Sequence, residues 1–487
     1  MNKDTIAAIA TGMTDAGIGI VRISGTDAVK IGDRVFRSKS KKKLCEQKSH
    51  TMHYGMITDG EELIDEALVS IMLAPHSYTG EDTVEINCHG GMYIINRILK
   101  TVLSNGARLA EPGEFTKRAF LNGKMDLSKA EAVMDLIHSK NDFALRNSLS
   151  QLSGSLSNEI KQMREEIIYE IAFIESALDD PEHISLDGYP ERLEKKINQL
   201  IFKVNELKDS FSNGRIRKEG IRTVIVGKPN AGKSSLLNAL SGEERAIVTS
   251  IAGTTRDVLE ESVRIGDVVL NLVDTAGIRE ASDEVEKIGV SKAKQYVEQA
   301  DLILYVVDSS MPLDKNDEEI ISLICGKQVI VLLNKSDLET VTTKEILLNK
   351  WEKAEIEDHK DETGKEKFVE TDHLRILNIS LNPKDTNLQT VNSAWREEFK
   401  EEIHKMFFSE NSHLNDEIVI TNLRHVQELE ECRESLILVL QSIDRNMPED
   451  FFSIDLTNAY VHLGNIIGEE ISDDLMDEIF SKFCMGK

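Results

Sequence analysis

Short apolar runs punctuated by glycine dominate the first part of the chain. The runs 18–23 and 67–73 have the length of strands, and glycine-containing turns separate them from their neighbours. Mixed with shorter helical stretches, this pattern is typical of an α+β domain. We therefore expect a compact amino-terminal α+β domain over about residues 1–120.

Apolar residues recur at helical spacing in two later regions. The first runs from residue 128 to about 178, where Asp180-Pro181 predicts a helix stop. The second covers 418–443 and then 456–483. A globular segment between the two regions predicts a helical domain that is discontinuous in sequence and carries an insertion.

The insertion contains a strand, a glycine-rich loop and a helix in direct succession. The apolar run 223–226 precedes GKPNAGKS, Gly227 to Ser234, and 235–240 reads as a helix. This context favours a phosphate loop over an ordinary glycine turn. Backbone N–H groups would face the phosphates, Lys233 would neutralise β and γ oxygens, and the Ser234 hydroxyl would bind Mg²⁺.

Two further motifs follow apolar runs and indicate guanine as the base. Asn334-Lys335-Ser336-Asp337 follows the run 329–333, at a strand end where open α/β sheets bind ligands. The Asp337 carboxylate can accept from guanine N1–H and the 2-amino group together, which adenine does not offer. Ser380-Leu381, after 375–379, would be the last base-binding element.

The run 268–273 ends in Asp274-Thr275-Ala276-Gly277, which would bring Asp274 near the magnesium and the Gly277 amide near the γ-phosphate. Together with the switch segment Gly253 to Asp257, the motifs resemble the translation-factor class of small GTPase domains, in which Thr255 would be the second magnesium ligand. Residue 278 is isoleucine, which cannot orient water, so hydrolysis needs another group. Glu284 and Glu286 are candidates, although acids at a solvated helix start are the alternative.

Composition narrows the class of protein. The chain has 487 residues, 40% of them hydrophobic, and no apolar run of membrane-spanning length or signal pattern, so we expect a multidomain cytoplasmic protein without a membrane span. Five scattered cysteines predict reduced thiols. The net charge of −27 argues against a DNA-binding protein, and we interpret the basic run 39–43 as a solvated loop, with a binding arm as the alternative.

Four segments outside the insertion resemble the MnmE (TrmE) family of tRNA-modification GTPases over essentially the whole chain. They are Asp4-Thr5-Ile6 through Gly19 to Gly25, Ser77 to Asp82 through Cys88 to Gly91, Glu111 to Thr116 through Leu121 to Lys124, and the terminal Phe483-Cys484-Met485-Gly486-Lys487.

The resemblance implies three domains in a multidomain α/β and α fold. A folate-binding α+β domain that also forms the homodimer would occupy 1–120, and a Ras-like phosphate-loop GTPase domain would be inserted at 218–384. The discontinuous helical domain would comprise 121–217 and 385–487. The folate site of the amino-terminal domain would be formed by Arg22, Glu85, Lys124 and Lys487, with Cys484 as a catalytic thiol.

The resemblance also implies how the nucleotide is held and hydrolysed. Glu286 would orient the attacking water, and K⁺ would take the place of an arginine finger, bound by Asn230, Thr249, Ile251 and Thr254. GTP and GDP would be bound by Asn230, Ala231, Gly232, Lys233, Ser234, Ser235, Thr249, Ser250, Ile251, Ala252, Gly253, Thr254, Thr255, Asp274, Thr275, Ala276, Gly277, Asn334, Lys335, Asp337 and Ser380.

The function implied by the family is modification of tRNA at the C5 atom of the wobble uridine. A 5-formyltetrahydrofolate or related tetrahydrofolate would donate the carbon, and an aminomethyl or carboxymethylaminomethyl group would result. A flavin-dependent MnmG (GidA)-type partner would supply FAD and complete a heterotetramer. The alternatives are a non-catalytic GTP switch in ribosome assembly or trafficking, and a dimeric scaffold with decayed hydrolysis.

Overall fold

A computed structural model describes residues 4–241, 260–266, 268–274, 295–358, 373–381, 388–408, 418–483 and 486. Contacts divide the chain into two units. The first comprises 1–138, 148–208 and 424–487, and the second comprises 139–147 and 209–423. Within the described residues, no helix is both long and apolar enough to cross a membrane.

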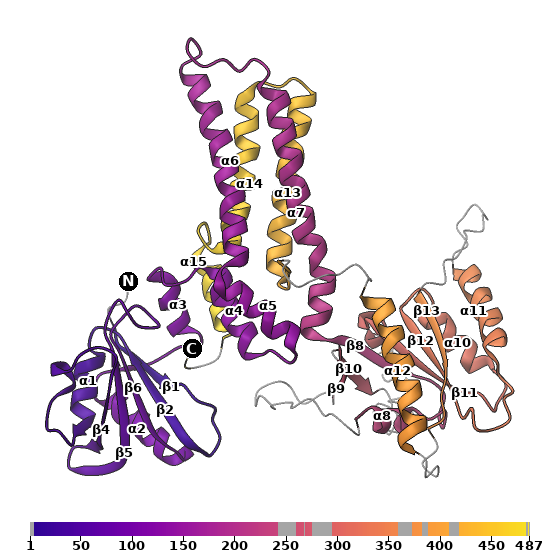
Figure 1. Ribbon diagram of the computed structural model, residues 1–487, viewed down its shortest axis with the longest axis horizontal. Helices are drawn as coiled ribbons and strands as arrows, with labels where there is room; N and C mark the ends of the chain where they lie inside the picture. Colours follow the sequence, from indigo (N-terminus) through magenta and orange to yellow (C-terminus); the bar gives the residue numbers. More distant parts are fainter. Residues whose placement is uncertain are drawn as a thin grey trace, which may run out of the picture. The chain divides into compact units, whose positions relative to one another are not determined.

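The amino-terminal part of the first unit is a seven-stranded, mainly antiparallel sheet in the order β3-β4-β5-β6-β2-β1-β7 (Figure 1). Residues alternate across it: Ala67, Val69 and Ile71 are buried against α1 and α2, while Leu68 points to the opposite, more open face. Its elements are β1 Ile6–Ile9, β2 Ala16–Ser24, α1 Ala28–Val35, β3 Phe36–Ser38, the 3₁₀ turn η1 Leu44–Glu46, β4 Thr51–Asp59, β5 Glu62–Met72, β6 Thr83–Gly90, α2 Met92–Ser104 and β7 Arg108–Leu109.

Long helices from both ends of the chain form the rest of this unit. Helix α6 packs along α14, and both lie beside α13 and the first part of α7 (Figure 1). The apolar residues of α6 at helical spacing, such as Ile160, Ile167 and Ile174, are fully buried. These helices are α3 Glu114–Leu121, α4 Leu127–Ile137, α5 Asp142–Ser153, α6 Ser155–Asp179, α7 Tyr189–Glu219, α13 Leu423–Asp444, α14 Glu449–Ile467 and α15 Asp473–Ser481. The start of α5 up to Asn147, the end of α7 from Asp209 and the first residue of α13 belong to the second unit.

The second unit contains a six-stranded sheet in the order β13-β12-β11-β8-β10-β9, parallel except for β9. Its strands are near-continuous apolar runs because both faces are covered, by α8 and α12 on one side and by α10 and α11 on the other. The elements are β8 Ile221–Val226, α8 Lys233–Ser241, β9 Glu260–Ile265, β10 Val268–Asp274, β11 Leu302–Asp308, α10 Lys315–Ile324, β12 Val329–Asn334, α11 Lys344–Asp358, β13 Leu374–Asn378 and α12 Leu388–Phe407.

The architecture is therefore the one expected from the sequence: an amino-terminal sheet domain, a helical domain, and an inserted Ras-like α/β domain with a central β8. Helix α12 lies beyond the boundary that we placed at 384, and it packs Trp395, Phe399 and Ile403 against the sheet of the inserted domain. The exact domain bounds remain a prediction.

Candidate functional site

The phosphate loop begins where β8 ends and leads into α8. Gly232 has a φ of 111°, and a Cβ at this position would lie 2.1 Å from Asn334 Nδ2, so only glycine fits. Asn230 also has a left-handed φ, 62°. Ala231 is buried, whereas Ser234 and Ser235 are exposed at the start of α8. The N-terminus of α8 is therefore shaped to receive an anion.

Two lysines of this loop are held in different ways. Lys233 Nζ donates to the carbonyl oxygens of Gly227 (2.9 Å) and Lys228 (2.7 Å), so its ammonium group lies against the loop that would cradle the phosphates. Lys228 Nζ lies 2.6 Å from Asp317 and 3.0 Å from Asp314, at the start of α10. Burial opposes the charge of Lys228, but its hydrogen bonds to these acids outweigh burial and raise its pKa.

The residues expected to bind guanine meet at the carboxyl ends of β12 and β13. Asn334 is buried, donates to the Ala231 carbonyl (2.9 Å) and accepts from the Leu381 backbone N–H (3.2 Å). Ser380 Oγ donates to Asp337 Oδ1 at 2.7 Å. The Asn334 loop, the phosphate loop and the Ser380 segment thus form one connected site, with the Asp337 side chain exposed to a ligand.

Sequence reasoning missed one acid of this site. Asp308 is the last residue of β11 and forms an ion pair with Lys335. In the sequence, the apolar run that ends at Asp308 could have pointed to it. Burial opposes ionisation of Asp308, but hydrogen bonds from Lys335 and Ser310 outweigh it and lower its pKa. Asp308 therefore fixes the charged end of Lys335, whose backbone has a φ of 63°.

Asp274 is the last residue of β10, which runs parallel to β8, so its backbone is at the same sheet edge as the phosphate loop. Within the described residues, no group of three or more His, Cys, Asp or Glu side chains is arranged to hold a metal. The remaining expected residues lie outside the described part of the chain: Thr249, Ser250, Ile251, Ala252, Gly253, Thr254, Thr255, Thr275, Ala276, Gly277, Glu284, Glu286, Cys484 and Lys487.

A second constellation lies on the sheet of the first unit and includes the carboxyl-terminal segment. Arg22 on β2 and Glu85 on β6 are register partners, and their side chains form an ion pair of 2.8 Å. The same guanidinium donates to the Gly486 carbonyl oxygen at 3.1 Å. It also lies 5.6 Å from the ring centroids of both Tyr78 and Phe115. Arg22 therefore joins residues from both ends of the chain.

Gly486 fits closely against strand β1. Its φ is 89°, and a Cβ at this position would lie 2.2 Å from the Ile9 carbonyl oxygen. Just before it, Phe480 and Phe483 are buried against α4. Packing and close backbone approach together hold the end of the chain on the amino-terminal sheet.

Lys124 makes a different contact from the other expected folate residues. Its Nζ donates to the Pro75 carbonyl oxygen at 3.1 Å, and its stem approaches Gly80. Arg22 and Lys124 therefore border the same loop, 75–82, through Tyr78 and Pro75 respectively. In the part of the chain that is described, no direct contact joins Lys124 to Arg22 or Glu85.

Sequence reasoning also missed a buried charge network beneath this loop. Arg118 on α3 is 8% exposed and donates to Asp4 (2.7 Å), Glu81 (3.2 Å) and Glu114 (3.0 Å). Burial opposes ionisation of Glu114, but hydrogen bonds from Arg108, the Glu111 backbone and Arg118 outweigh it and lower its pKa. The sequence did offer a signal for this network: Asp4, Glu81 and Glu114 each lie in one of the segments that carry the family resemblance.

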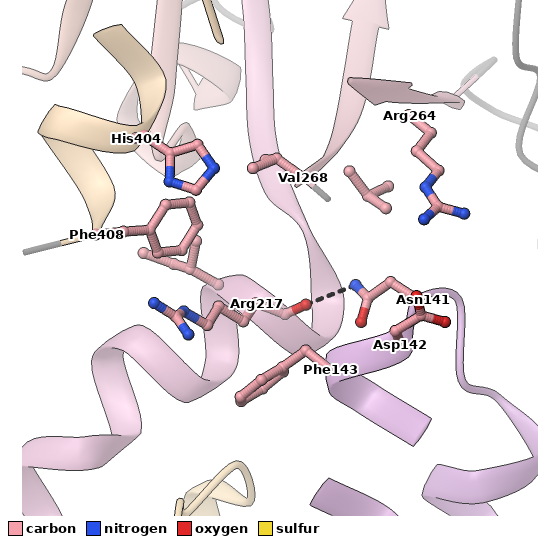
Figure 2. Close-up of a pocket in the computed structure, with 10 residues that line it drawn as sticks. Asn141, Asp142, Phe143, Arg217, Arg264, Val268, His404 and Phe408 are labelled. Carbon is pink, nitrogen blue, oxygen red and sulfur yellow. Dashed lines mark hydrogen bonds between the residues drawn. The ribbon is translucent and has the colours of Figure 1, made fainter. Parts of the chain in front are cut away.

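A small cavity of about 80 Å³ lies elsewhere in the second unit, between the start of α5, the end of α7, β9, β10 and α12 (Figure 2). The Arg217 guanidinium lies 4.8 Å from the Phe408 ring centroid and 5.6 Å from that of Phe143. Asn141 donates to the Arg217 carbonyl oxygen at 2.7 Å. The cavity is too small for a nucleotide, which needs several hundred Å³.

Comparisons with known proteins cover the whole chain. The family described as "GTP-binding protein TrmE N-terminus" matches residues 5–124, and the family described as "MnmE helical domain" matches 127–484. The protein named tRNA modification GTPase MnmE in Lachnoclostridium phytofermentans is 52% identical, with 100% of each chain covered. Proteins of the same name in Clostridioides difficile and Geobacillus thermodenitrificans are 44% and 43% identical, with 99% of each chain covered.

Among solved structures, a mutant of Aquifex aeolicus Era bound to GDP·AlF4⁻ is 29% identical, with a TM-score of 0.26 over 45% of this chain and 67% of that one. The G domain of the T. maritima FeoB iron transporter is 23% identical, with a TM-score of 0.22 over 38% and 98%. The strand order given above identifies the fold directly.

Proposed function

The chain belongs to the MnmE family of tRNA modification GTPases, and from this membership we propose that it hydrolyses GTP to modify the wobble uridine of certain tRNAs. The observation that carries the proposal beyond a GTPase is the contact of Arg22 with both Glu85 and the Gly486 carbonyl oxygen. A GTP switch needs no such junction between the two ends of the chain. A substrate site built at that junction explains why both ends are held there.

In the nucleotide site, the residues of this chain would bind and orient GTP. Backbone N–H groups of the Asn230–Ser235 loop and the Lys233 ammonium would hold the phosphates, while Asp337 would select guanine. Ser234 and Thr255 would hold Mg²⁺, which when bound offsets charge on the β and γ oxygens. Glu286 would orient the attacking water because Ile278 has no polar group for that task.

A potassium site is part of this proposal. The Asn230 side chain, with Thr249, Ile251 and Thr254, would supply the oxygen ligands that suit a hard cation. K⁺, when bound, would place positive charge beside the phosphate at which negative charge develops. GTP hydrolysis should therefore be faster in KCl than in NaCl of equal concentration, and Asn230→Ala should abolish the difference. Equal wild-type rates in the two salts would contradict the site.

In the amino-terminal domain, a tetrahydrofolate would bring the one-carbon unit. Glu85 and Arg22 offer an acceptor and a donor to the polar edge of a pterin, and Tyr78 and Phe115 border the same guanidinium with apolar rings. Lys124 and Lys487 would bind the glutamate carboxylate of the folate. Cys484 would act as the thiol of this site.

Two partners complete the proposed reaction. A second copy of this chain would cover the exposed apolar side chains Met52, Tyr54 and Leu68 on the open face of the amino-terminal sheet. A flavoprotein of the MnmG type would supply FAD and reduced nicotinamide chemistry and form a heterotetramer. The product would be an aminomethyl or carboxymethylaminomethyl group on C5 of the uridine.

Nucleoside analysis of tRNA tests the proposal directly. Cells that lack the gene should lose the modified wobble uridine, and the wild-type gene should restore it. Arg22→Ala should fail to restore it although the purified variant hydrolyses GTP at the wild-type rate. Unchanged modified uridine in the deletion strain would leave only a GTP-dependent switch.

A further inference from the structure

We propose that a basic surface at the β3 edge of the amino-terminal sheet binds the phosphate backbone of tRNA. The inference rests on the proposed function, which gives tRNA as the polyanionic substrate. We call this surface the basic edge. It consists of Arg37, Lys39, Lys41, Lys42, Lys43 and Lys48.

The basic edge differs in sign from the rest of the chain. The net charge is −27, yet this short segment contains six cations and a single acid, Glu46. A polyanion is repelled by most of such a protein and is attracted where positive charge is concentrated. The basic edge offers that concentration beside β3, which is the last strand on its side of the sheet.

The cations of the basic edge are not neutralised by neighbouring acids. Among the described residues, no carboxylate forms an ion pair with Lys41, Lys42, Lys43 or Lys48, and the lysines at 41–43 are exposed. Elsewhere many cations are locally paired, as in Lys196–Glu166 and Lys208–Glu430, each at 2.7 Å. No protein carboxylate therefore competes with a ligand phosphate for these lysines.

The backbone that carries these lysines is anchored. Leu44 is 1% exposed and belongs to the core under the sheet. Asp33 on α1 accepts hydrogen bonds from the backbone N–H groups of Leu44 and Cys45, the latter at 3.1 Å. The Lys41 N–H donates to the Ser38 carbonyl oxygen at 3.0 Å. Because the backbone is already ordered, binding costs less conformational entropy than it would for a loose loop.

The position of the basic edge suits an RNA substrate that must also reach Arg22. Four strand spacings separate β3 from β2 in the sheet, which is roughly 19 Å at about 4.8 Å per spacing. This separation is comparable with the width of an RNA helix. Phosphates of a tRNA stem can contact the basic edge while the single-stranded loop that the stem carries presents its uridine nearer the Arg22 junction.

The test is a tRNA-binding measurement with the full-length protein carrying K41Q, K42Q and K43Q together. Lys39 is kept, because its ammonium lies 4.2 Å from the centroid of the Tyr54 ring on the open face. The control carries K30Q, K100Q and K161Q, three exposed lysines on other elements, and so has the same net charge. Unmodified tRNA transcript is titrated at several KCl concentrations, with and without the flavoprotein partner.

Loss of three phosphate contacts should reduce the slope of log K against log[salt] by about 2 to 3, and weaken binding on the order of a hundredfold at 0.1 M salt. The control should keep the wild-type slope. Equal slopes for the two triple variants would overturn the proposal, and so would wild-type protein that shows no salt-dependent tRNA binding in either condition.

Two further measurements separate loss of tRNA binding from loss of the dimer and from failure of the proposed function. Light scattering should give the same mass for the K41Q/K42Q/K43Q variant as for the wild type; a variant that dissociates instead of losing tRNA would assign the surface to a second copy and refute the RNA contact. Nucleoside analysis of the deletion strain reports independently on the proposed function. If modification depends on the gene while the two variants bind tRNA equally, only the basic edge is rejected.

Discussion

At the scale of single residues, Lys228 ties the phosphate loop to the start of α10. Its partner Asp317 is 1% exposed and also accepts a hydrogen bond from the buried Tyr305 hydroxyl at 2.8 Å. Burial and the neighbouring Asp317 charge together raise the pKa of Tyr305, so this hydroxyl stays neutral and remains a donor. Lys228 is the cation that balances the buried acid.

Lys228→Met should therefore destabilise the inserted domain and weaken nucleotide binding. Removing the cation should cost less than the about 3 to 5 kcal/mol of a fully buried pair, because Lys228 is 19% exposed, but more than a surface pair, because Asp317 is buried. The phosphate loop would also lose its contact with α10. Thermal unfolding and GDP titration measure the two effects. Lys350→Met is the matched control. Lys350 on α11 pairs with the exposed Glu318 on α10, the helix that begins beside Asp314, and such exposed pairs contribute about 0 to 1 kcal/mol. Equal behaviour of the two variants would contradict a positioning role for Lys228.

Gly486→Ala should displace the end of the chain from β1. The new methyl group would lie 2.2 Å from the Ile9 carbonyl oxygen, and Arg22 would lose its bond to the Gly486 carbonyl. Binding of 5-formyltetrahydrofolate, measured by calorimetric titration, should fall at least tenfold, while GTP hydrolysis stays at the wild-type rate. A tenfold loss corresponds to about 1.4 kcal/mol.

The control for that substitution is Gly60→Ala. Gly60 has a similar positive φ, 62°, but its added Cβ would meet open space. It therefore imposes a backbone strain of about 1 to 2 kcal/mol without a collision. Folate affinity that falls equally in both variants would show that strain in the amino-terminal domain, and not the position of the terminus, governs binding.

At the scale of elements, a buried acid on α4 fastens that helix to α13. Glu131 accepts from Arg424 at 2.9 Å and from His425 at 2.7 Å. Burial alone would raise the pKa of Glu131, but the charges and hydrogen bonds of His425 and Arg424 outweigh it and lower the pKa to about 2. The carboxylate form of Glu131 therefore stabilises the contact between the two helices.

The sign of the pH dependence follows from that shift. The pKa of Glu131 is lowered on folding from its ordinary 4.5, so its contribution is present above about pH 4.5 and is lost as the pH falls toward 2. The shift corresponds to about 3 kcal/mol. Glu131→Gln should lower the urea midpoint of the helical signal at pH 7, and the difference from wild type should shrink toward pH 2. Glu478→Gln, which removes an exposed acid on α15, should change little at any pH.

The sequence predicted elements best where a local signal exists. The helix stop at Asp180 agrees with the end of α6 at Asp179, and the strand before the phosphate loop is β8. The helical run 456–483 is in fact α14 and α15, separated by a turn at Gly468, because a period alone does not reveal a break between two helices of similar pattern. We expected α12 in the helical domain because we ended the inserted domain at 384, after the last motif; no local pattern reports which sheet a helix packs against, and α12 packs against the sheet of the inserted domain.

For the candidate sites too, the sequence predicted what a local pattern encodes and not which distant residues meet. Motif residues such as Lys233 and Asp337 could be proposed from the sequence because their expected function depends on a short contiguous pattern. The Lys228–Asp317 and Arg118–Asp4 pairs join residues far apart in sequence, and no local pattern reports such a contact. Arg22 and Glu85 were placed together only through the family resemblance, and antiparallel register is the physical reason that they meet.

At the scale of the whole molecule, the nucleotide residues belong to one contact unit, and Arg22 with Gly486 to the other. If GTP hydrolysis drives tRNA modification, a change of nucleotide specificity in the second unit must change what the first unit can do. Coupling of this kind is a free-energy relation between two sites and can be tested without knowing its route. Asp337, the side chain that we propose selects the base, allows such a test.

Asp337→Asn should transfer the dependence from GTP to xanthosine triphosphate. The carboxylate would accept from guanine N1–H and the 2-amino group, and hydrogen bonds to a charged group contribute about 1.5 to 3 kcal/mol each, so GTP affinity should fall on the order of 10²- to 10³-fold. Xanthine carries a carbonyl in place of the amino group, which accepts from the new amide. In a reaction reconstituted with tRNA, a folate and the flavoprotein, the variant should form modified uridine with xanthosine triphosphate and not with GTP. If the variant modified tRNA equally with GTP and with xanthosine triphosphate, or without any nucleotide, hydrolysis would be separate from the chemistry on tRNA.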